Sequence, residues 1–411
     1  MLNNIGFELL FRADALAIFM ACVSGFVGLL IVIYSIGYMK KYPRKIEFFS
    51  FIFVFLFAMM GLIFSANLLL MYIFWEITAF CSWRLIGFYR KEKDLWFADK
   101  AFLVTFFGAS LMLAGLVLIY INYGTFDMSA LKGSPVSNLI FVLLIFGIFS
   151  KSAQLPLSSW LPDAGVAPSP VTALLHAAVL VKIGVYAYAR FFCEVFVISD
   201  IAKVGLLAVV MLSGFVAAMS ALKENNIKKI LAYSTISQLA YIFLGFIVNS
   251  AMAIGAALLY ILVHSVGKAG LFLTVGIVEQ KTHTKDLAKL GGLMKFMPMV
   301  SLAFLLSAFS IIGLPPFGGF FSKFYVVLAT AQAGYRLLAV VAILTAFITL
   351  LYLMRLFNGI FLGEVKTPIK GSIPLTMSTV VLICGIISLA IGIFIKYPLG
   401  LVNSIGLVLN K

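Results

Sequence analysis

Long apolar stretches separated by short polar segments follow one another along almost the whole chain. About 20 consecutive apolar residues suffice for a helix to cross the hydrocarbon core of a bilayer. By this criterion the pattern predicts a single all-α membrane domain, residues 1–411, with about 12 transmembrane helices. The predicted helices cover approximately residues 13–38, 48–65, 67–89, 101–121, 138–161, 170–192, 204–222, 229–248, 251–279, 296–330, 335–361 and 373–396.

Proline and glycine interrupt the fifth and the tenth of these helices. The fifth contains FGIFSKSAQLPLSSWLPDA, with Pro156 and Pro162, and the tenth contains FSIIGLPPFGGFFSKFYVV, with Pro315 and Pro316. Proline lacks a backbone donor and clashes with the preceding turn, so we expect both helices to break. Carbonyl groups that are freed at membrane depth need water or a protein partner.

The two broken helices are five helices apart, an odd number, so equivalent units built around them would be inverted across the membrane. Interrupted segments at matching positions of two halves point to the ion pathway of an inverted-repeat transporter. We therefore expect two inverted five-helix halves, residues 48–192 (helices 2 to 6) and 204–361 (helices 7 to 11), with a flanking helix at each end.

The composition identifies the solvent of this protein. The chain is 63% hydrophobic and 11% charged, with a mean hydropathy of +1.14. A soluble domain cannot bury so much apolar surface, which leaves lipid as the expected solvent. The net charge of +15 would suggest nucleic acid in a soluble protein. In a membrane protein, basic cytoplasmic loops and anionic lipid explain it, and no nucleic-acid partner is expected.

Lysine and arginine are divided unevenly between the two sides of the predicted bundle. The loops after odd-numbered helices, with the adjoining helix ends, hold 18 of them, including Lys40, Lys91 and Lys370, whereas the other side holds 7, including Lys411. The positive-inside rule places the first set in the cytoplasm and both termini outside. We expect a multi-pass protein of the cell (inner or cytoplasmic) membrane.

The other basic residues lie inside apolar helices, where the one clearly intramembrane carboxylate is Glu76. These five residues are Arg84, Lys151, Lys182, Lys268 and Lys323. A charge in the bilayer interior is costly unless it is paired, and such residues mark ion paths. The alternative for Glu76 is a structural ion pair between two helices. The alternative for the lysines is snorkelling to the interface, which suits residues near helix ends.

The lysines and two histidines together favour a proton relay. Four lysines cannot all be charged and paired with one carboxylate, so some are expected to be neutral near pH 7 and able to accept a proton. His264 and Lys268 lie four residues apart on one helix face. His176 and Lys182 share a helix, about 9 Å apart along its axis and about 120° apart around it, so a direct hand-over would need water. Each histidine shares a helix with a buried lysine, which favours a relay over isolated core histidines.

Arg84 is expected to be structural. Arginine keeps its proton at any physiological pH, so this residue cannot relay one. It would pair with Glu76 on its own helix or reach toward the cytoplasmic end near Tyr89.

No motif for a metal or a cofactor is present. The four cysteines are scattered and show no CxxC spacing, and one of only three histidines, His283, lies in a predicted loop. The sequence also contains no dinucleotide fingerprint and no haem-binding pattern. We therefore expect no cofactor, no metal and no redox centre in this chain.

Several of these stretches resemble a known family, the antiporter-like proton-translocating membrane subunits. That family is shared by respiratory complex I (NADH-quinone oxidoreductase), Mrp cation/proton antiporters and membrane-bound energy-converting hydrogenases. The resemblance runs from about residue 13 to 396 and is most specific between helices 5 and 6. It is carried by FWEITAFCSWRLIGFY, FGIFSKSAQLPLSSWLPDAGVAPSPVTALLHAAVLVKIGVYAYARF, NNIKKILAYSTISQLAYIFLGF, HSVGKAGLF and GLPPFGGFFSK.

The resemblance implies roles for individual residues. Glu76 matches the family's glutamate that pairs with a lysine on the first broken helix, here Lys151. The residues that match the family's wetted central axis, with a half-channel on each side, are His176, Lys182, His264, Lys268 and Lys323. Under this resemblance the first helix here corresponds to the family's usual third, and the distal complex I subunit's lateral helix is not expected. The motifs are closest to the Mrp and hydrogenase-type members.

The expected function is proton translocation by one subunit of a larger membrane complex. The expected partners are other membrane subunits, lipid and possible redox proteins of a hydrophilic arm, such as those of a hydrogenase or an NADH dehydrogenase. The protein would then be a translocase subunit without a reaction centre of its own. The alternative is an Mrp-type Na⁺/H⁺ antiporter subunit without electron transfer. A passive scaffold is disfavoured by the surplus of buried lysines. The nitrogen bases along the path are poor sodium ligands, so any Na⁺ is expected to pass through another subunit.

Overall fold

The computed structural model describes residues 10–367, 369 and 371–409, and helices make up nearly all of its regular structure. The chain begins with α1 (Ala15–Tyr38), η2 (Met39–Lys41), α2 (Lys45–Phe64), α3 (Leu68–Ile86) and α4 (Glu92–Tyr123). The next elements are β1 (Ser134–Pro135), α5 (Asn138–Ser152), α6 (Trp160–Asp163), η3 (Ala164–Val166), α7 (Ser169–Ala173), η4 (Leu174–Ala178), α8 (Leu180–Tyr188), η5 (Ala189–Val195) and β2 (Phe196–Val197). The last elements are α9 (Asp200–Lys223), α10 (Ile227–Val248), α11 (Ala251–Thr282), η6 (Leu287–Lys289), η7 (Leu293–Lys295), α12 (Pro298–Ile312), α13 (Gly318–Gln332), α14 (Arg336–Phe361), α15 (Leu375–Ile393) and α16 (Lys396–Leu409).

The predicted all-α membrane fold is confirmed. Ten helical stretches of the described chain are long and apolar enough to span a membrane, and α5 and α12 are shorter apolar helices. Both predicted breaks are present, since α5 ends at Ser152 and α12 ends at Ile312. The division into inverted halves, 48–192 and 204–361, stays a prediction.

Some predicted boundaries were wrong. α4 begins at Glu92 rather than at residue 101, because its first turns carry charged residues that a hydropathy criterion assigns to a loop. The last predicted crossing corresponds to α15, which ends at Ile393, but a further helix follows it. After a turn at Phe394 and Ile395 the chain continues as α16 to Leu409, where polar residues had hidden the helix.

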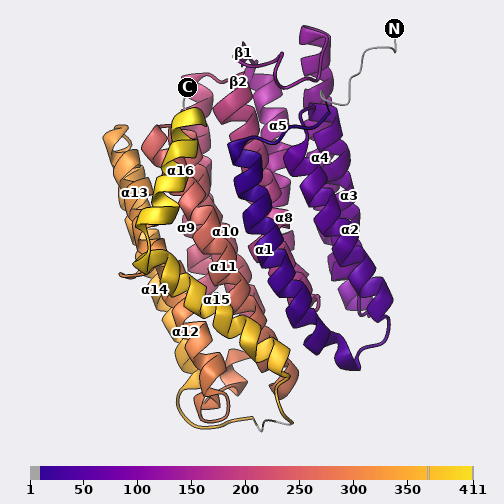
Figure 1. Ribbon diagram of the computed structural model, residues 1–411, viewed down its shortest axis with the longest axis vertical. Helices are drawn as coiled ribbons and strands as arrows, with labels where there is room; N and C mark the ends of the chain where they lie inside the picture. The colour runs from indigo at the N-terminus through magenta and orange to yellow at the C-terminus, as the bar shows by residue number, and fades with distance from the viewer. Residues whose placement is uncertain (1–9, 368, 370, 410–411) are drawn as a thin grey trace.

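The helices run roughly along one axis of the molecule and connect at its two ends (Figure 1). The loops at 42–44 and 283–297 lie at one end, which we call the lysine end. The two-stranded parallel sheet of β1 and β2 lies at the other end, which we call the arginine end. Both termini, Lys370 and Lys411 lie outside the described residues, so the predicted external termini remain a prediction.

The centre of the bundle is formed by α10, α11 and the segment from α7 to η5. The apolar windows of α10 and α11 are 94% buried and that of Ser169–Val195 is fully buried, against 33% for α14. The peripheral helices therefore present apolar side chains to lipid, and the central helices carry the buried polar residues described next.

Candidate functional site

The first broken helix ends directly after Lys151. Ala153 adopts a left-handed conformation (φ 49°) and closes α5 through its N–H to the Phe149 carbonyl. The Ser150 carbonyl, left without a helical partner, accepts a hydrogen bond of 2.9 Å from the Trp160 indole. The break is thus satisfied by protein groups, as backbone at membrane depth requires.

Lys151 is completely buried against α3. Its ammonium donates to the Trp75 carbonyl and to the Thr78 hydroxyl, both at 3.2 Å. It also lies 5.6 Å from the centre of the Trp75 ring, within the range of a cation–π contact. Snorkelling is therefore excluded for this lysine, because its amine is held in the interior by polar atoms and a ring.

Glu76 lies on the same turn of α3 but is only half-buried. No ion pair within 4.0 Å joins it to Lys151, although both are described residues, so the pairing implied by the resemblance is not a direct contact here. One Glu76 oxygen, Oε1, is buried with no hydrogen-bond partner in the described chain. The carboxylate is nevertheless close enough to interact with Lys151 through its charge.

The second broken helix is interrupted between α12 and α13, and glycines lie on both sides of the break. Gly313 closes α12 with a left-handed φ of 88°, and a Cβ on Gly319 would lie 1.8 Å from the Ser310 carbonyl oxygen. Only glycine allows α13 to approach the end of α12 so closely. The Lys323 amine thereby reaches the free carbonyls of Ile311 (2.7 Å) and Ile312 (3.1 Å).

Lys323 also faces two aromatic rings. Its amine lies 5.0 Å from the ring centre of Tyr241 and 5.6 Å from that of Tyr260. The carbonyl end of a helix attracts a cation, and so do the faces of aromatic rings. These contacts offset part of the cost of burying a positive charge.

Lys268 belongs to a chain of hydrogen bonds between α10, α11 and α14. Its amine donates to the Ser234 hydroxyl at 2.6 Å, and Tyr352 donates to the same hydroxyl at 2.7 Å. Gln238 donates to the Tyr352 hydroxyl at 3.3 Å and accepts a hydrogen bond from Tyr260, whose ring lies beside Lys323. These polar residues connect the surroundings of two lysines and were missed in the sequence, although Ser234 and Gln238 show the i, i+4 spacing of one helix face.

His176, Lys182 and His264 are completely buried, and none of their side-chain nitrogens has a hydrogen-bond partner in the described chain. His176 stacks on Phe272, with ring centres 4.5 Å apart, and His264 packs edge-on against Tyr260. Buried polar groups without a protein partner are costly unless water reaches them.

The helix that carries His176 is irregular. His176 lies in the π-helix η4, and Val179 (φ −132°, ψ −75°) separates η4 from α8, which carries Lys182. The spacing calculated for a regular helix is therefore wrong for His176 and Lys182. π-helical turns inside α-helices often occur at functional sites.

Arg84 pairs with Glu47 at 2.7 Å, and Arg90 binds the same carboxylate at 3.0 Å. Of the two predicted alternatives for Arg84, pairing with Glu76 was therefore wrong, and which side of the membrane this contact faces stays a prediction. All three side chains are partly exposed, unlike the buried lysines.

A second charged cluster at the lysine end was missed in the sequence. Glu279 forms ion pairs with Lys228 at 2.6 Å and with Lys285 at 3.0 Å. The Lys228 side chain is 1% exposed, although its position at the start of a helix had placed it among loop lysines. The cluster borders a cavity of about 980 Å³.

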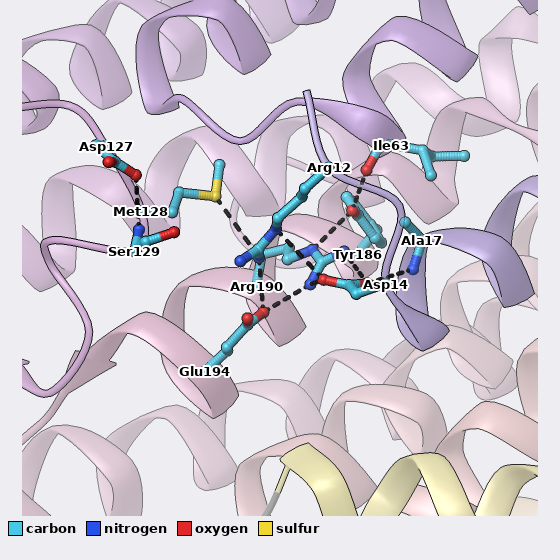
Figure 2. A network of polar contacts seen from close by, with 10 residues as sticks. All are labelled: Arg12, Asp14, Ala17, Ile63, Asp127, Met128, Ser129, Tyr186, Arg190 and Glu194. Carbon is cyan, nitrogen blue, oxygen red and sulfur yellow. Dashed lines mark hydrogen bonds and ion pairs between the residues drawn. The ribbon is translucent and has the colours of Figure 1, made fainter. Parts of the chain in front are cut away.

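The arginine end carries a network of two arginines and two carboxylates. Figure 2 shows Arg12 and Arg190 converging on Asp14 and Glu194. Arg190 holds both Asp14 oxygens at 2.6 Å and Glu194 at 2.7 Å, and its Nε donates to the Tyr186 hydroxyl at 2.7 Å. Burial raises the pKa of Asp14, but the hydrogen bond and charge of Arg190 outweigh burial and hold that pKa below its usual value.

Comparisons with known proteins agree with the geometry. Residues 65–349 match the family model described as NADH:quinone oxidoreductase/Mrp antiporter, TM, and residues 1–49 match that of the NADH-ubiquinone oxidoreductase (complex I) chain 5 N-terminus. The chain is 34% identical over 390 residues to the Na(+)/H(+) antiporter subunit A1 of Staphylococcus aureus strains JH9 and Newman, which covers 86% of this chain and 48% of theirs. It therefore spans about half the length of these relatives.

A solved structure shares the fold. It is described as the structure of the Mrp complex from Dietzia sp. DQ12-45-1b, and it superposes with a TM-score of 0.89 at 23% identity, over 98% of this chain and 84% of that one. The family model alone covers more than half of the sequence. The chain is thus a multi-pass, antiporter-like membrane protein that belongs to the NADH:quinone oxidoreductase/Mrp antiporter family.

Proposed function

We propose that this chain translocates protons along its buried lysines and histidines, as one subunit of a larger membrane complex. The observation that carries the proposal is the completely buried set Lys151, His176, Lys182, His264 and Lys268, together with Lys323 at 6% exposure. Charged or polar groups are rarely kept in a membrane interior for packing alone, and these groups outnumber the carboxylates near them.

The side chains suit proton transfer. Amines and imidazoles accept and release protons when burial brings the charged and neutral forms close in energy. The unpartnered nitrogens of His176, Lys182 and His264 are the positions where water would complete a path, since no described protein group bonds to them. Glu76, beside Lys151, would set the proton affinity of that lysine through its charge.

The names of the similar proteins bear on the type of complex and on its energy source. The names of the relatives describe Na⁺/H⁺ antiporter subunits and an Mrp complex. They favour the second candidate, an Mrp-type exchanger without electron transfer, over a redox-driven pump. In both cases the lysine end would face the cytoplasm, because most loop lysines lie on that side. Copurification of the native complex separates the candidates, since only a redox pump brings a hydrophilic iron–sulfur or nickel partner.

The central test is Lys151→Ala in proteoliposomes that contain the whole complex. With an imposed membrane potential, we expect proton uptake, followed with a trapped pH dye, to fall roughly 100-fold, the scale of losing a positioned proton-transfer group. Lys151→Arg should not restore uptake, because arginine holds its proton. Glu76→Gln should slow uptake about tenfold, since the carboxylate acts through Lys151.

The matched control is Lys93→Ala, because Lys93 is exposed at the start of α4. It should leave uptake unchanged. Wild-type uptake by assembled Lys151→Ala complex would refute proton translocation through this site. Tracer sodium uptake that persists with a protonophore and disappears in Lys151→Ala would show that the central path itself carries sodium.

A further inference from the structure

A polar cavity of about 980 Å³ opens at the lysine end, between the ends of α1, α3, α10 and α11. Its lining includes Tyr38, Asp94, Asn226, Glu279 and Lys285. A cavity of this size and polarity accommodates many water molecules. It is therefore a recess at the lysine end that water can fill.

The three charged side chains of this cluster differ in their exposure to solvent, from Lys285, the most exposed, to Lys228, the least. The side chains of Lys285 and Glu279 are 29% and 20% exposed, whereas that of Lys228 is 1% exposed. Lys228 donates to the Ala167 carbonyl at 3.0 Å in addition to its ion pair with Glu279. Glu279 thus stands between the cavity and a lysine that the cavity does not reach.

From this cluster two elements run side by side toward His176. Ser169, at the start of α7, donates to Glu279 at 2.9 Å, and seven residues further on, in η4, His176 stacks on Phe272 of α11. Glu279 and Phe272 are likewise seven residues apart on α11. At 1.5 Å per residue the cluster lies about 10 Å from His176.

We propose that Glu279 and Lys228 form the proton-exchange site through which the cavity feeds His176. Neither residue belongs to the buried series of lysines and histidines described above, and the inference rests on the proposed proton translocation. Both partners can change protonation state, unlike an arginine in the same place.

The transfer balances as a relay. A proton from cavity water binds the Glu279 carboxylate, which weakens its hold on the Lys228 ammonium. Lys228 then releases one proton inward toward His176 and becomes a neutral amine. The protonated Glu279 passes its proton to that amine, which restores the carboxylate and the ammonium with one proton moved inward.

The decisive variant is Lys228→Arg in the assembled complex. Arginine keeps the ion pair with Glu279 but does not release a proton, so a structural pair would tolerate it and a relay would not. We expect proton uptake to fall roughly 100-fold. The matched control is Lys229→Arg, since the neighbouring Lys229 is one-third exposed and pairs with Asp163 at 2.7 Å. It should transport normally.

The outcomes separate this inference from the proposed function. Normal uptake by Lys228→Arg together with loss in Lys151→Ala overturns the relay and leaves translocation standing. Normal uptake by both variants refutes translocation itself. If Lys228→Arg fails to assemble, Glu279→Gln decides, because glutamine can keep the hydrogen bonds to Ser169 and Lys228 but cannot take up the proton; unchanged uptake would then overturn the relay.

A second measurement checks the cavity. Thr284 lines it, so Thr284→Cys should react with a charged, water-soluble thiol reagent, and the modified complex should transport more slowly. A cysteine at this position that stays unreactive would show that the recess is closed to water and would overturn the proposal.

Discussion

The two ends of the bundle carry charged clusters that differ in the basic residue that binds the carboxylates, which is arginine at one end and lysine at the other. At the arginine end, Arg190 binds both oxygens of Asp14 and also contacts Glu194 and Tyr186, with 1% of its side chain exposed (Figure 2). At the lysine end, Glu279 contacts two lysines and borders a wide cavity. Both clusters border a cavity, since Glu194 lines one of about 380 Å³ at the arginine end. The first cluster is built on a base that never gives up its proton, whereas the second is built on bases that do.

The difference suggests that the type of basic residue decides the role of a charged cluster. An arginine cluster can only stabilise the fold, whereas a lysine cluster can also exchange protons. Both clusters join distant parts of the chain by ion pairs of similar length. The arginine cluster fixes the segment before α1 to η5, and Tyr186 extends it to the Ile63 carbonyl at the end of α2. In the lysine cluster the same attraction holds groups whose protons are exchangeable. The contrast predicts that the arginine end governs stability and the lysine end governs transport.

The largest effect on stability is expected for Arg190→Met. The change removes the fork that holds Asp14 and leaves two carboxylates with Arg12 alone, which should cost about 3–5 kcal/mol of unfolding free energy. Thermal unfolding of the purified complex and the fraction of assembled complex measure it. Arg190→Lys should recover only part of the loss, because an ammonium cannot reproduce the planar fork.

Its control is Arg336→Met, at an exposed position at the start of α14. Assembly of Arg190→Met with wild-type stability would contradict the prediction that the arginine end governs stability. Loss of transport by the assembled fraction of that variant would also contradict the contrast between the two ends, because the arginine cluster would then take part in proton transfer.

A smaller effect on stability is expected for Lys228→Met. Glu279 keeps Lys285 and Ser169 and remains in contact with the cavity, so the loss should be about 1.5–3 kcal/mol, the contribution of one hydrogen bond to a charged group. Unfolding and proton uptake are measured on the same preparation. A loss of stability as large as that of Arg190→Met, with normal uptake, would show that the lysine cluster stabilises the fold and takes no part in transport.

The smallest effect is expected for Glu47→Gln. The carboxylate binds Arg84 and Arg90 at the lysine end, but all three side chains are more than one-fifth exposed. Partly exposed ion pairs contribute about 0–1 kcal/mol, so stability should change little and transport not at all. A strong loss of transport would give Arg84 a role that its position does not suggest.

The residues that could be predicted from sequence are those whose chemistry contrasts with their neighbours. Lys151, Lys182, Lys268 and Lys323 stand out because each interrupts an apolar run, and the structure buries all four. The breaks were equally visible, since proline removes backbone hydrogen bonds wherever it occurs.

The remainder could not be predicted because it depends on contacts between distant segments. Lys228 and Glu279 lie near helix ends, where a buried lysine and a loop lysine have the same local sequence. The partner of Arg84 proved to be Glu47, on another helix. The π-helical turn at His176 follows from packing around η4, and nothing in TALLHAAV distinguishes it from a regular helix.

The approach of Gly319 to Ser310 limits how this chain can vary during evolution. A turn residue other than proline could still end α12, but any residue with a β-carbon at 319 would collide with the Ser310 carbonyl and push the two half-helices apart. The Ile311 and Ile312 carbonyls would then move away from the Lys323 amine. The absence of a β-carbon at residue 319 therefore determines whether the Lys323 ammonium can be accommodated, although residue 319 itself carries no charged group. Variation at residue 319 should be as restricted as variation at the lysine itself.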